Sequence, residues 1–300
     1  LSSYLKIKKN IYFSNKLKET IHFINSEFLN KKFNLLGSAY DADSEGEEGK
    51  YYTFKYNEIS NIKDIEKFYE ILPEGNWEKK IILRELKDPN SNIKQELLNI
   101  RKTKKKPFFD EKVQLDLNCM WISSLINTYY VNKDKYYLEL AENFFNNLKT
   151  KFDENNLHHS YSKNHVFLED YAYYTSMLLD LYDATMDLNY KNKSLKVYSS
   201  TLNKFYDKKK KIFQKNPLSN NDLFFNPIDI GDSTIPNGNS IMLFNMVRLG
   251  KLSDAKTLAQ SLYGYLNIYN NYMISSLKSL DYFTEKNLGK ECGPDGCKSI

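Results

Sequence analysis

Long apolar runs, cysteine and tryptophan are scarce or missing in this sequence. No stretch approaches the roughly 20 apolar residues that a membrane span needs, and the first residues show no signal-peptide pattern. Cys119 falls inside an apolar helical stretch, so Cys292 and Cys297 remain as two of the four ligands that a structural zinc site needs. We therefore expect a cytoplasmic protein with no membrane contact, no metal and no cofactor.

Apolar side chains make up 41% of the 300 residues, which is enough for a sizeable core and excludes a wholly disordered chain. Tyr and Phe are abundant, and they suit helices packed on both faces or a pocket that stacks on flat ligands. The net charge of +5 comes from scattered Lys residues. The basic runs at 101–106 and 208–211 lack interleaved aromatics and Gly, so we expect no nucleic-acid partner.

From about residue 112 onward the sequence repeats a unit of a helix, a short turn, a second helix and a longer polar connection. The turns carry Asn, Asp, Ser or Gly, which cap and end helices. The first helices are expected at 113–130, 167–186 and 238–249, and the second helices at 134–150, 191–206 and 253–267. The pattern predicts three sequential helical hairpins.

The two helices of a hairpin differ in their predicted burial. The helix at 134–150 has a single apolar face with Tyr137, Ala141 and Phe144, whereas the helix at 167–186 is apolar nearly all round. Alternation of buried and half-exposed helices is what a two-layered ring requires. We predict an all-α fold, an incomplete (α/α) toroid of the six-hairpin type, with a simple bundle as the alternative.

Two long connections, 151–166 and 207–235, contain short alternating runs and predict small β-hairpins at one end of the toroid. The region before residue 112 is less regular. There we expect helices at about 14–31, 57–72 and 90–104, a strand, acidic turn and strand after residue 35, and a short strand within 76–86. The opening residues read like a helical region already under way, so we expect an upstream portion.

The first candidate site is the acidic turn from Asp41 to Gly49, with five acidic residues in nine. Such a turn repels itself unless cations or water screen it. Its Gly spacing differs from that of an EF-hand, and it lacks the Glu at the twelfth position. A catalytic carboxylate at Asp41 or Asp43, a calcium loop and a solvated turn are the alternatives.

Further acidic clusters precede the three predicted inner helices. Glu169 and Asp170 enter the second of these helices, where the helix dipole favours them. In a toroid of sequential hairpins, the N-terminal ends of all inner helices lie on one face, so the clusters should converge there. Carboxylates gathered in this way suit acid–base chemistry on a sugar. Tyr and His side chains from the loops could take part in this chemistry. His158, His159 and His165 lie in one such connection, although a histidine in a surface loop is more often inert.

Several segments resemble one known family in the same order: "SAYDADSEGEEGKYYTF", "GNWEKKIILREL", "KPFFDEKVQLDLNCMWISSL", "FLEDYAYYTSMLLDLYDAT" and "PNGNSIMLFNMVRL". This is the thioredoxin-domain-containing family that includes spermatogenesis-associated protein 20. The likeness covers nearly the whole chain, including the Cys-bearing tail. Where the family carries Trp-Asn-Gly, this chain has Leu117-Asn118-Cys119, and Trp121 stands one turn further along.

The resemblance implies a toroid related to six-hairpin glycosidases and N-acylglucosamine 2-epimerases, fused in the full-length protein to an N-terminal thioredoxin-like domain absent from this chain. We accordingly expect a partial toroid at 1–283 and a Cys-containing tail at 284–300. Cys292 and Cys297 are candidate redox residues.

The leading functional hypothesis is a carbohydrate-active or carbohydrate-binding domain with a sugar-like substrate. The alternatives are a non-catalytic recruiting or scaffold module for the thioredoxin-like domain, and a sugar epimerase or isomerase with a His base. The candidate catalytic residues are Asp41, Asp43, Glu169 and Asp170. The candidate substrate-binding residues are Asp110, Lys112, Asn118, Tyr171, Asp232, Asn237 and Asn239.

Overall fold

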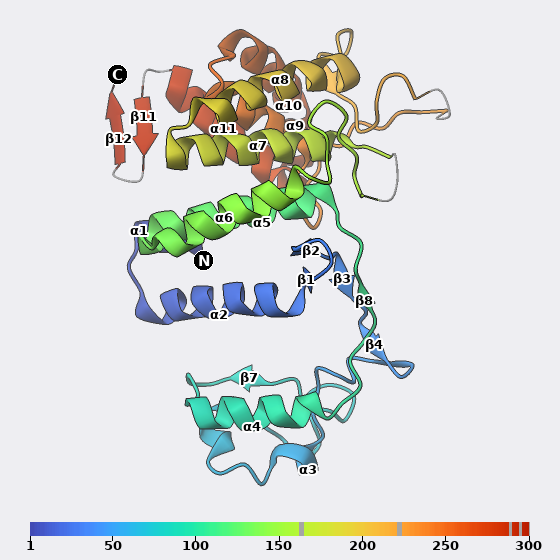
Figure 1. Cartoon of the computed structure of the whole chain (residues 1–300), viewed down its shortest axis with the longest axis vertical. Coiled ribbons are helices and arrows are strands. Elements are labelled where there is room, and N and C mark those ends of the chain that lie inside the picture. The colour runs from blue at the N-terminus through green and yellow to red at the C-terminus, as the bar shows by residue number, and fades with distance from the viewer. Residues whose placement is uncertain (162–164, 221–223, 288–289, 294–295, 300) are drawn as a thin grey trace. The chain divides into compact units, whose positions relative to one another are not determined.

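A computed structural model describes residues 1–161, 165–220, 224–287, 290–293 and 296–299. It divides into two compact units, the first formed by 1–37 with 112–300 and the second by 38–111. The helices are α1 (Ser2–Ile7), α2 (Ile11–Glu27), α3 (Tyr56–Ile59), α4 (Ser91–Lys102), α5 (Leu115–Asn132), α6 (Lys135–Leu148), α7 (Leu168–Thr185), α8 (Leu188–Phe205), α9 (Gly238–Arg248), α10 (Leu252–Tyr269) and α11 (Ile274–Asn287) (Figure 1).

All strands are short and pair as antiparallel two-stranded ribbons. The pairs are β1 (Leu29–Asn30) with β2 (Leu35–Leu36), β3 (Ala39–Tyr40) with β8 (Phe109–Asp110), β4 (Asp43–Ser44) with β5 (Glu47–Glu48), β6 (Tyr69–Glu70) with β7 (Arg84–Glu85), β9 (Tyr206–Asp207) with β10 (Ile212–Phe213), and β11 (Lys290–Gly293) with β12 (Gly296–Ser299).

The first unit contains the three predicted hairpins, α5–α6, α7–α8 and α9–α10 (Figure 1). Helix α7 packs against both α5 and α9, while α1 packs on α5 and α11 packs on α9, so these five helices form an inner layer. Burial separates the layers: 12 of the 18 residues of α7 are buried, but only 5 of the 18 in its partner α8. The fold is an incomplete (α/α) toroid, as predicted.

Helices α7 and α9 of the inner layer run parallel, because their N-terminal ends lie together and their C-terminal ends lie together. At the C-terminal ends, the guanidinium of Arg248 on α9 lies 2.8 Å from carboxylate oxygens of Asp180 and Asp183 on α7. At the N-terminal ends, the backbone N–H of Gly238 on α9 donates to Glu169 on α7 at 3.2 Å. The predicted convergence of the inner-helix N-termini on one face is confirmed for α7 and α9.

Local sequence explains where these helices start and stop. Asp134, Asp187 and Asn237 each cap a helix by accepting a hydrogen bond from a backbone N–H of its first turn. Helices α5 and α7 end at Lys133 and Met186, both in the left-handed backbone region. In the described ranges, no helix is at once long enough and apolar enough to cross a bilayer.

The β-hairpin predicted in the connection 207–235 is confirmed in part as β9–β10, which begins one residue earlier. In the connection 151–166, the described residues form only an isolated bridge between Ser160 and Gln114. Backbone atoms of β2 and β10 are hydrogen-bonded to Asn118 on α5 and Asn239 on α9. These two ribbons therefore lie at the N-terminal end of the inner layer.

The second unit, 38–111, has a small core of its own, formed by Phe54, Ile59, Ile62, Ile65, Ile81, Ile93 and Leu97. The prediction of a helix over 57–72 is wrong. Ile59, Ile62 and Ile65 have helical spacing, but α3 ends after one turn and Asp64 adopts a left-handed φ of 63° before a short 3-10 turn at Ile65–Lys67. The predicted helix at 90–104 is confirmed as α4.

Asn118 joins α5 to the β1–β2 ribbon, and its replacement tests this tie. Its fully buried amide donates to the carbonyls of Leu36 and Gln114 and accepts from the N–H of Leu36. Asn118→Ala should lower the free energy of unfolding, measured in urea, by about 3 kcal/mol because it leaves buried backbone groups unpaired. Ser124→Ala, at an exposed position of the same helix, should change it by less than about 0.5 kcal/mol. Equal effects of both variants would contradict the tie.

Candidate functional site

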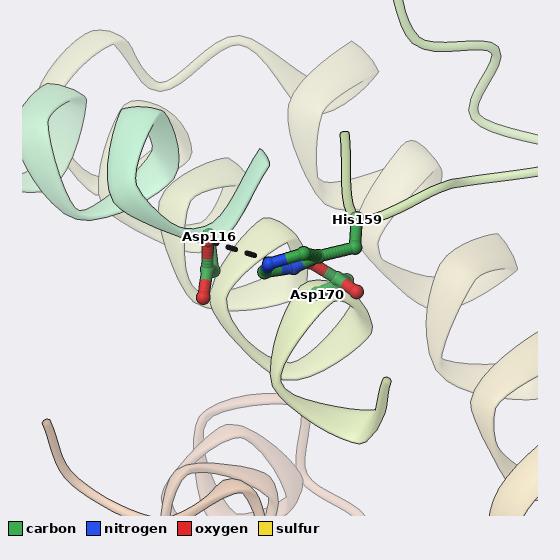
Figure 2. Close-up of side chains that lie close together, drawn as sticks. All are labelled: Asp116, His159 and Asp170. Carbon is green, nitrogen blue, oxygen red and sulfur yellow. Dashed lines mark hydrogen bonds and ion pairs between the residues drawn. The ribbon is translucent and has the colours of Figure 1, made fainter. Parts of the chain in front are cut away.

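Three side chains from the start of α5, the start of α7 and the connection 149–167 gather at the N-terminal end of the inner layer. Figure 2 shows Asp116, His159 and Asp170 pointing toward one another. Nδ1 of His159 lies 2.9 Å from Oδ1 of Asp170 and 3.9 Å from Oδ1 of Asp116. One imidazole thus stands between two carboxylates.

Asp170 is completely buried and fully engaged. Its Oδ2 accepts a hydrogen bond from the N–H of Phe167 at 2.8 Å, which closes the first turn of α7, and its Oδ1 faces His159. Burial raises the pKa of the Asp170 carboxyl, and the hydrogen bond with His159 opposes that rise. The Asp170 carboxylate therefore holds the His159 imidazole in place.

His159 is fixed through its backbone as well as its ring. Its carbonyl accepts from the N–H of Leu115 at 2.9 Å, and its N–H donates to His165 at 2.7 Å. In the neutral ring, Nδ1–H donates to Asp170, and Nε2, 2.7 Å from the Gln114 amide nitrogen, accepts from that amide. The hydrogen bond to Asp170 raises the pKa of His159, although partial burial opposes the rise.

Glu169 lies beside this cluster and is 9% exposed. Its Oε1 accepts from the N–H of Gly238, while its Oε2 is buried with no hydrogen-bond partner among the described residues. A Cβ at Gly238 would lie 2.8 Å from Leu168 and 3.1 Å from Oε1 of Glu169, so only Gly permits this approach. Burial raises the pKa of Glu169, and burial followed by the charge of Asp170 raises the pKa of Asp116.

A cavity of about 320 Å³ opens at this point of the first unit. It is large enough for a small ligand. Its lining includes an ion pair, with Nζ of Lys215 lying 3.0 Å from Oδ2 of Asp229. The lining residues are Asp116, His159, Phe167, Glu169, Lys215, Asp229, Gly231, Ser233, Thr234, Ile235, Pro236 and Asn237.

Asp116, His159 and Asp170 also present one ligand atom each within 4.8 Å of one another. Two carboxylates and an imidazole are ligand types that a divalent metal accepts. The 2.9 Å separation of His159 and Asp170 is a normal charge-assisted hydrogen bond, which accounts for this geometry without an ion.

Of the predicted catalytic residues, Glu169 lines the cavity and Asp170 lies directly behind His159. Asp41 and Asp43 belong to the other unit, where both are exposed. The acidic turn that contains them is balanced locally: Lys50 lies 2.9 Å from Glu45, and Lys80 lies 2.5 Å from Glu47. A catalytic role for Asp41 or Asp43 stays a prediction.

The predicted substrate-binding residues fall into three groups. Asn237 lines the cavity, and Asp232 holds the lining loop by accepting hydrogen bonds from Asn237 and from the N–H of Ser275. Asn118, Asn239 and Tyr171 are buried away from the lining, the last with its hydroxyl 2.7 Å from Nζ of Lys204. Asp110 lies in β8 of the second unit, and Lys112 is exposed at the edge of the first.

Cys292 and Cys297 face each other as backbone partners in the β11–β12 ribbon. Their side chains lie outside the described part of the structure, so their predicted redox role stays a prediction.

Sequence reasoning missed His159, Asp116 and Lys215. The sequence favours a surface position for His159, whereas in the structure it is half-buried against Asp170. Asp116 occupies the first turn of α5, as Glu169 and Asp170 occupy that of α7, and this shared position was a signal that could have identified it. No comparable sequence pattern marks Lys215, because its position at the cavity depends on the fold of the loop after β10.

Comparison with models of known protein families finds no match, and comparison with curated proteins finds none. The resemblance to the thioredoxin-domain-containing family therefore stays a prediction. Among solved structures, cellobiose 2-epimerase from Spirochaeta thermophila is similar with a TM-score of 0.45 at 10% identity, over 56% of this chain and 47% of that enzyme. The chain thus spans less than half the length of the epimerase.

A glycoside hydrolase family 76 mannosidase from Bacteroides thetaiotaomicron is similar with a TM-score of 0.43 at 15% identity, over 84% of this chain and 72% of that one. An inactive variant of an alpha-1,6-mannanase from Salegentibacter, in complex with alpha-1,6-mannotriose, is similar with a TM-score of 0.43 at 15% identity, over 83% and 69%. The assignment of this chain as a toroid rests on the contacts between its own helices.

Titration of His159 tests its pairing with Asp170. We expect the imidazole, followed by NMR, to titrate above its ordinary value of 6.5 and Asp170→Asn to lower its pKa because the main cause of the rise is removed. Since the folded pKa lies above the unfolded one, the pair's stabilisation is complete below pH 6.5 and is lost as pH rises through the folded pKa. Asp183→Asn, at the opposite helix ends, is the control and should leave the titration unchanged. An unaltered titration in Asp170→Asn would refute the pairing.

Proposed function

We propose that this chain is a carbohydrate-active domain that carries out acid–base chemistry on a sugar in the cavity at the N-terminal ends of α5, α7 and α9. The observation that carries the proposal is the hydrogen bond of 2.9 Å between buried Asp170 and the cavity-lining His159. A half-buried histidine held by a buried carboxylate is an arrangement suited to proton transfer.

His159 is the proton-transfer group, and Asp170 is the positioning residue that orients the ring and stabilises its positive charge. A sugar oxygen that replaces the Gln114 amide at Nε2 receives the proton from the imidazolium. The hydrogen bond to Asp170 raises the pKa of His159, and this favours the protonated ring that such an acid requires.

Glu169 is the partner carboxylate on the same cavity. In glycoside hydrolysis it activates the attacking water or stabilises the positive charge that develops on the sugar ring. Glu169 is buried, and its Oε2 accepts no hydrogen bond from a described residue, so no such bond competes for this oxygen. Asp116, 3.9 Å from the ring of His159, adds negative charge to the same cavity.

A sugar epimerase is the second candidate function, and the position of His159 is compatible with it. An epimerase of this kind requires a histidine base that lines the cavity, and His159 meets this requirement. In that reaction the neutral imidazole removes a proton from the carbon next to the carbonyl of an open-chain sugar, which leaves an imidazolium and an enediolate. The imidazolium then returns a proton to the opposite face of that carbon after the enediolate has rotated, and the carbonyl re-forms.

Activity measurements on the two side chains test the proposal. Once a panel of mono- and oligosaccharides has yielded a substrate, His159→Gln and Glu169→Gln should each lower kcat/KM by about 100-fold or more because each loses a proton-transfer or charge-stabilising group. Glu139→Gln, on the exposed face of α6, is the matched control and should retain full activity. Asp43→Asn tests the other predicted carboxylate in the same assay.

Product analysis distinguishes the two reactions. Hydrolysis releases a shorter sugar, whereas epimerisation in D2O incorporates deuterium at the reacting carbon. If both His159→Gln and Glu169→Gln remain folded and turn over substrate like the unchanged protein, the proposed site is wrong.

A further inference from the structure

The cavity has more carboxylates than cations. Asp116, Glu169 and Asp229 line it, and Asp170 lies behind His159, whereas Lys215 and His159 are the only basic side chains among the described residues of the lining. Each of these two is already bound to a carboxylate, Lys215 to Asp229 at 3.0 Å and His159 to Asp170 at 2.9 Å. Asp116 and Glu169 form no ion pair with a lysine or arginine among the described residues, although His159 lies 3.9 Å from Asp116 and the charge of Lys215 lowers the pKa of Glu169.

Glu169 supplies an independent indication of a ligand. Glu169 is 9% exposed, and its Oε2 accepts no hydrogen bond from any described residue. A buried carboxylate oxygen without a donor is costly, so native structures usually supply one. Because the terminal torsion of Glu is broad and nearly two-fold, rotation can present either oxygen to the cavity.

We infer that the cavity binds a sugar carrying a protonated amine, with the ammonium held by Glu169 and by the negative charge of Asp116. This inference rests on the proposed sugar chemistry and deepens it by naming the charge class of the substrate. An ammonium has three donors and no acceptor, so it matches an acceptor-only carboxylate. Ionised groups form stronger hydrogen bonds than neutral ones, which makes the amine a better partner than a hydroxyl.

The same charges act against anionic sugars. A sugar carboxylate or phosphate in the cavity would meet Asp116 and Glu169, and it could gain Lys215 only by displacing Asp229 from a formed ion pair. Like charges brought together in a partly buried site disfavour binding. Among sugars of similar shape, the cavity should therefore bind cationic sugars most tightly, neutral sugars less tightly and anionic sugars least tightly.

Binding of three monosaccharides with the same ring tests this order: glucosamine, glucose and glucuronate, measured by calorimetry or ligand-observed NMR at pH 7. We expect glucosamine to bind about tenfold or more tightly than glucose, and glucuronate to bind more weakly than glucose. Raising the ionic strength should reduce the preference, because salt screens charges that remain partly exposed to solvent.

Two variants connect the preference to the named carboxylates. Glu169→Gln and Asp116→Asn should each reduce the ratio of glucosamine to glucose affinity, while Glu139→Gln on α6 leaves the ratio unchanged. Thermal melting shows whether each variant is folded. If Asp116→Asn fails to fold, Glu169→Gln alone decides the outcome, because it keeps the shape and removes only the charge.

Failure of this inference can be told apart from failure of the proposed function. If glucose binds and glucosamine gains nothing, or if the preference survives in folded Glu169→Gln, the charge selection is wrong and the sugar site stands. If none of the three sugars, nor any sugar of the wider panel, binds or is turned over, the proposed function fails and this inference falls with it.

Discussion

The hydrogen bond between buried Asp170 and His159 is the interaction on which the rest of the site depends. Asp170 closes the first turn of α7 through the N–H of Phe167 and holds the imidazole with its other oxygen. A single carboxylate thus ties α7 to the connection that precedes it. Because burial of an unpaired charge is costly, the carboxylate and its two donors stabilise one another.

The parallel arrangement of the inner helices explains why the chemistry is concentrated at one end. The N-terminal turns of α5 and α7 carry acidic side chains, and these lie close to backbone N–H groups, as the contact of Gly238 on α9 with Glu169 on α7 illustrates. At the other end, Arg248 meets Asp180 and Asp183 in a compact ion-pair group. The cavity thus lies at the N-terminal ends of these helices, and an ion-pair group joins α7 to α9 at the opposite ends.

Periodicity in the sequence was sufficient to predict the hairpins but not the site. The helix predicted at 167–186 is α7 at Leu168–Thr185, because its apolar positions and capping signals agree. The prediction of a helix at 57–72 is wrong because the chain turns locally at Asp64. The same spacing of isoleucines is compatible with this turn. Glu169 was identifiable from its place at a helix start. His159 was not, since its role depends on a tertiary contact with Asp170 that no local pattern encodes.

A crystal structure of the protein soaked with a monosaccharide would test the central claim most directly. We expect sugar density in the cavity, with sugar oxygens within hydrogen-bond distance of His159 and Glu169. Sugar bound elsewhere, for example at Asp41 and Asp43 of the second unit, with the cavity between α5, α7 and α9 left empty, would contradict it.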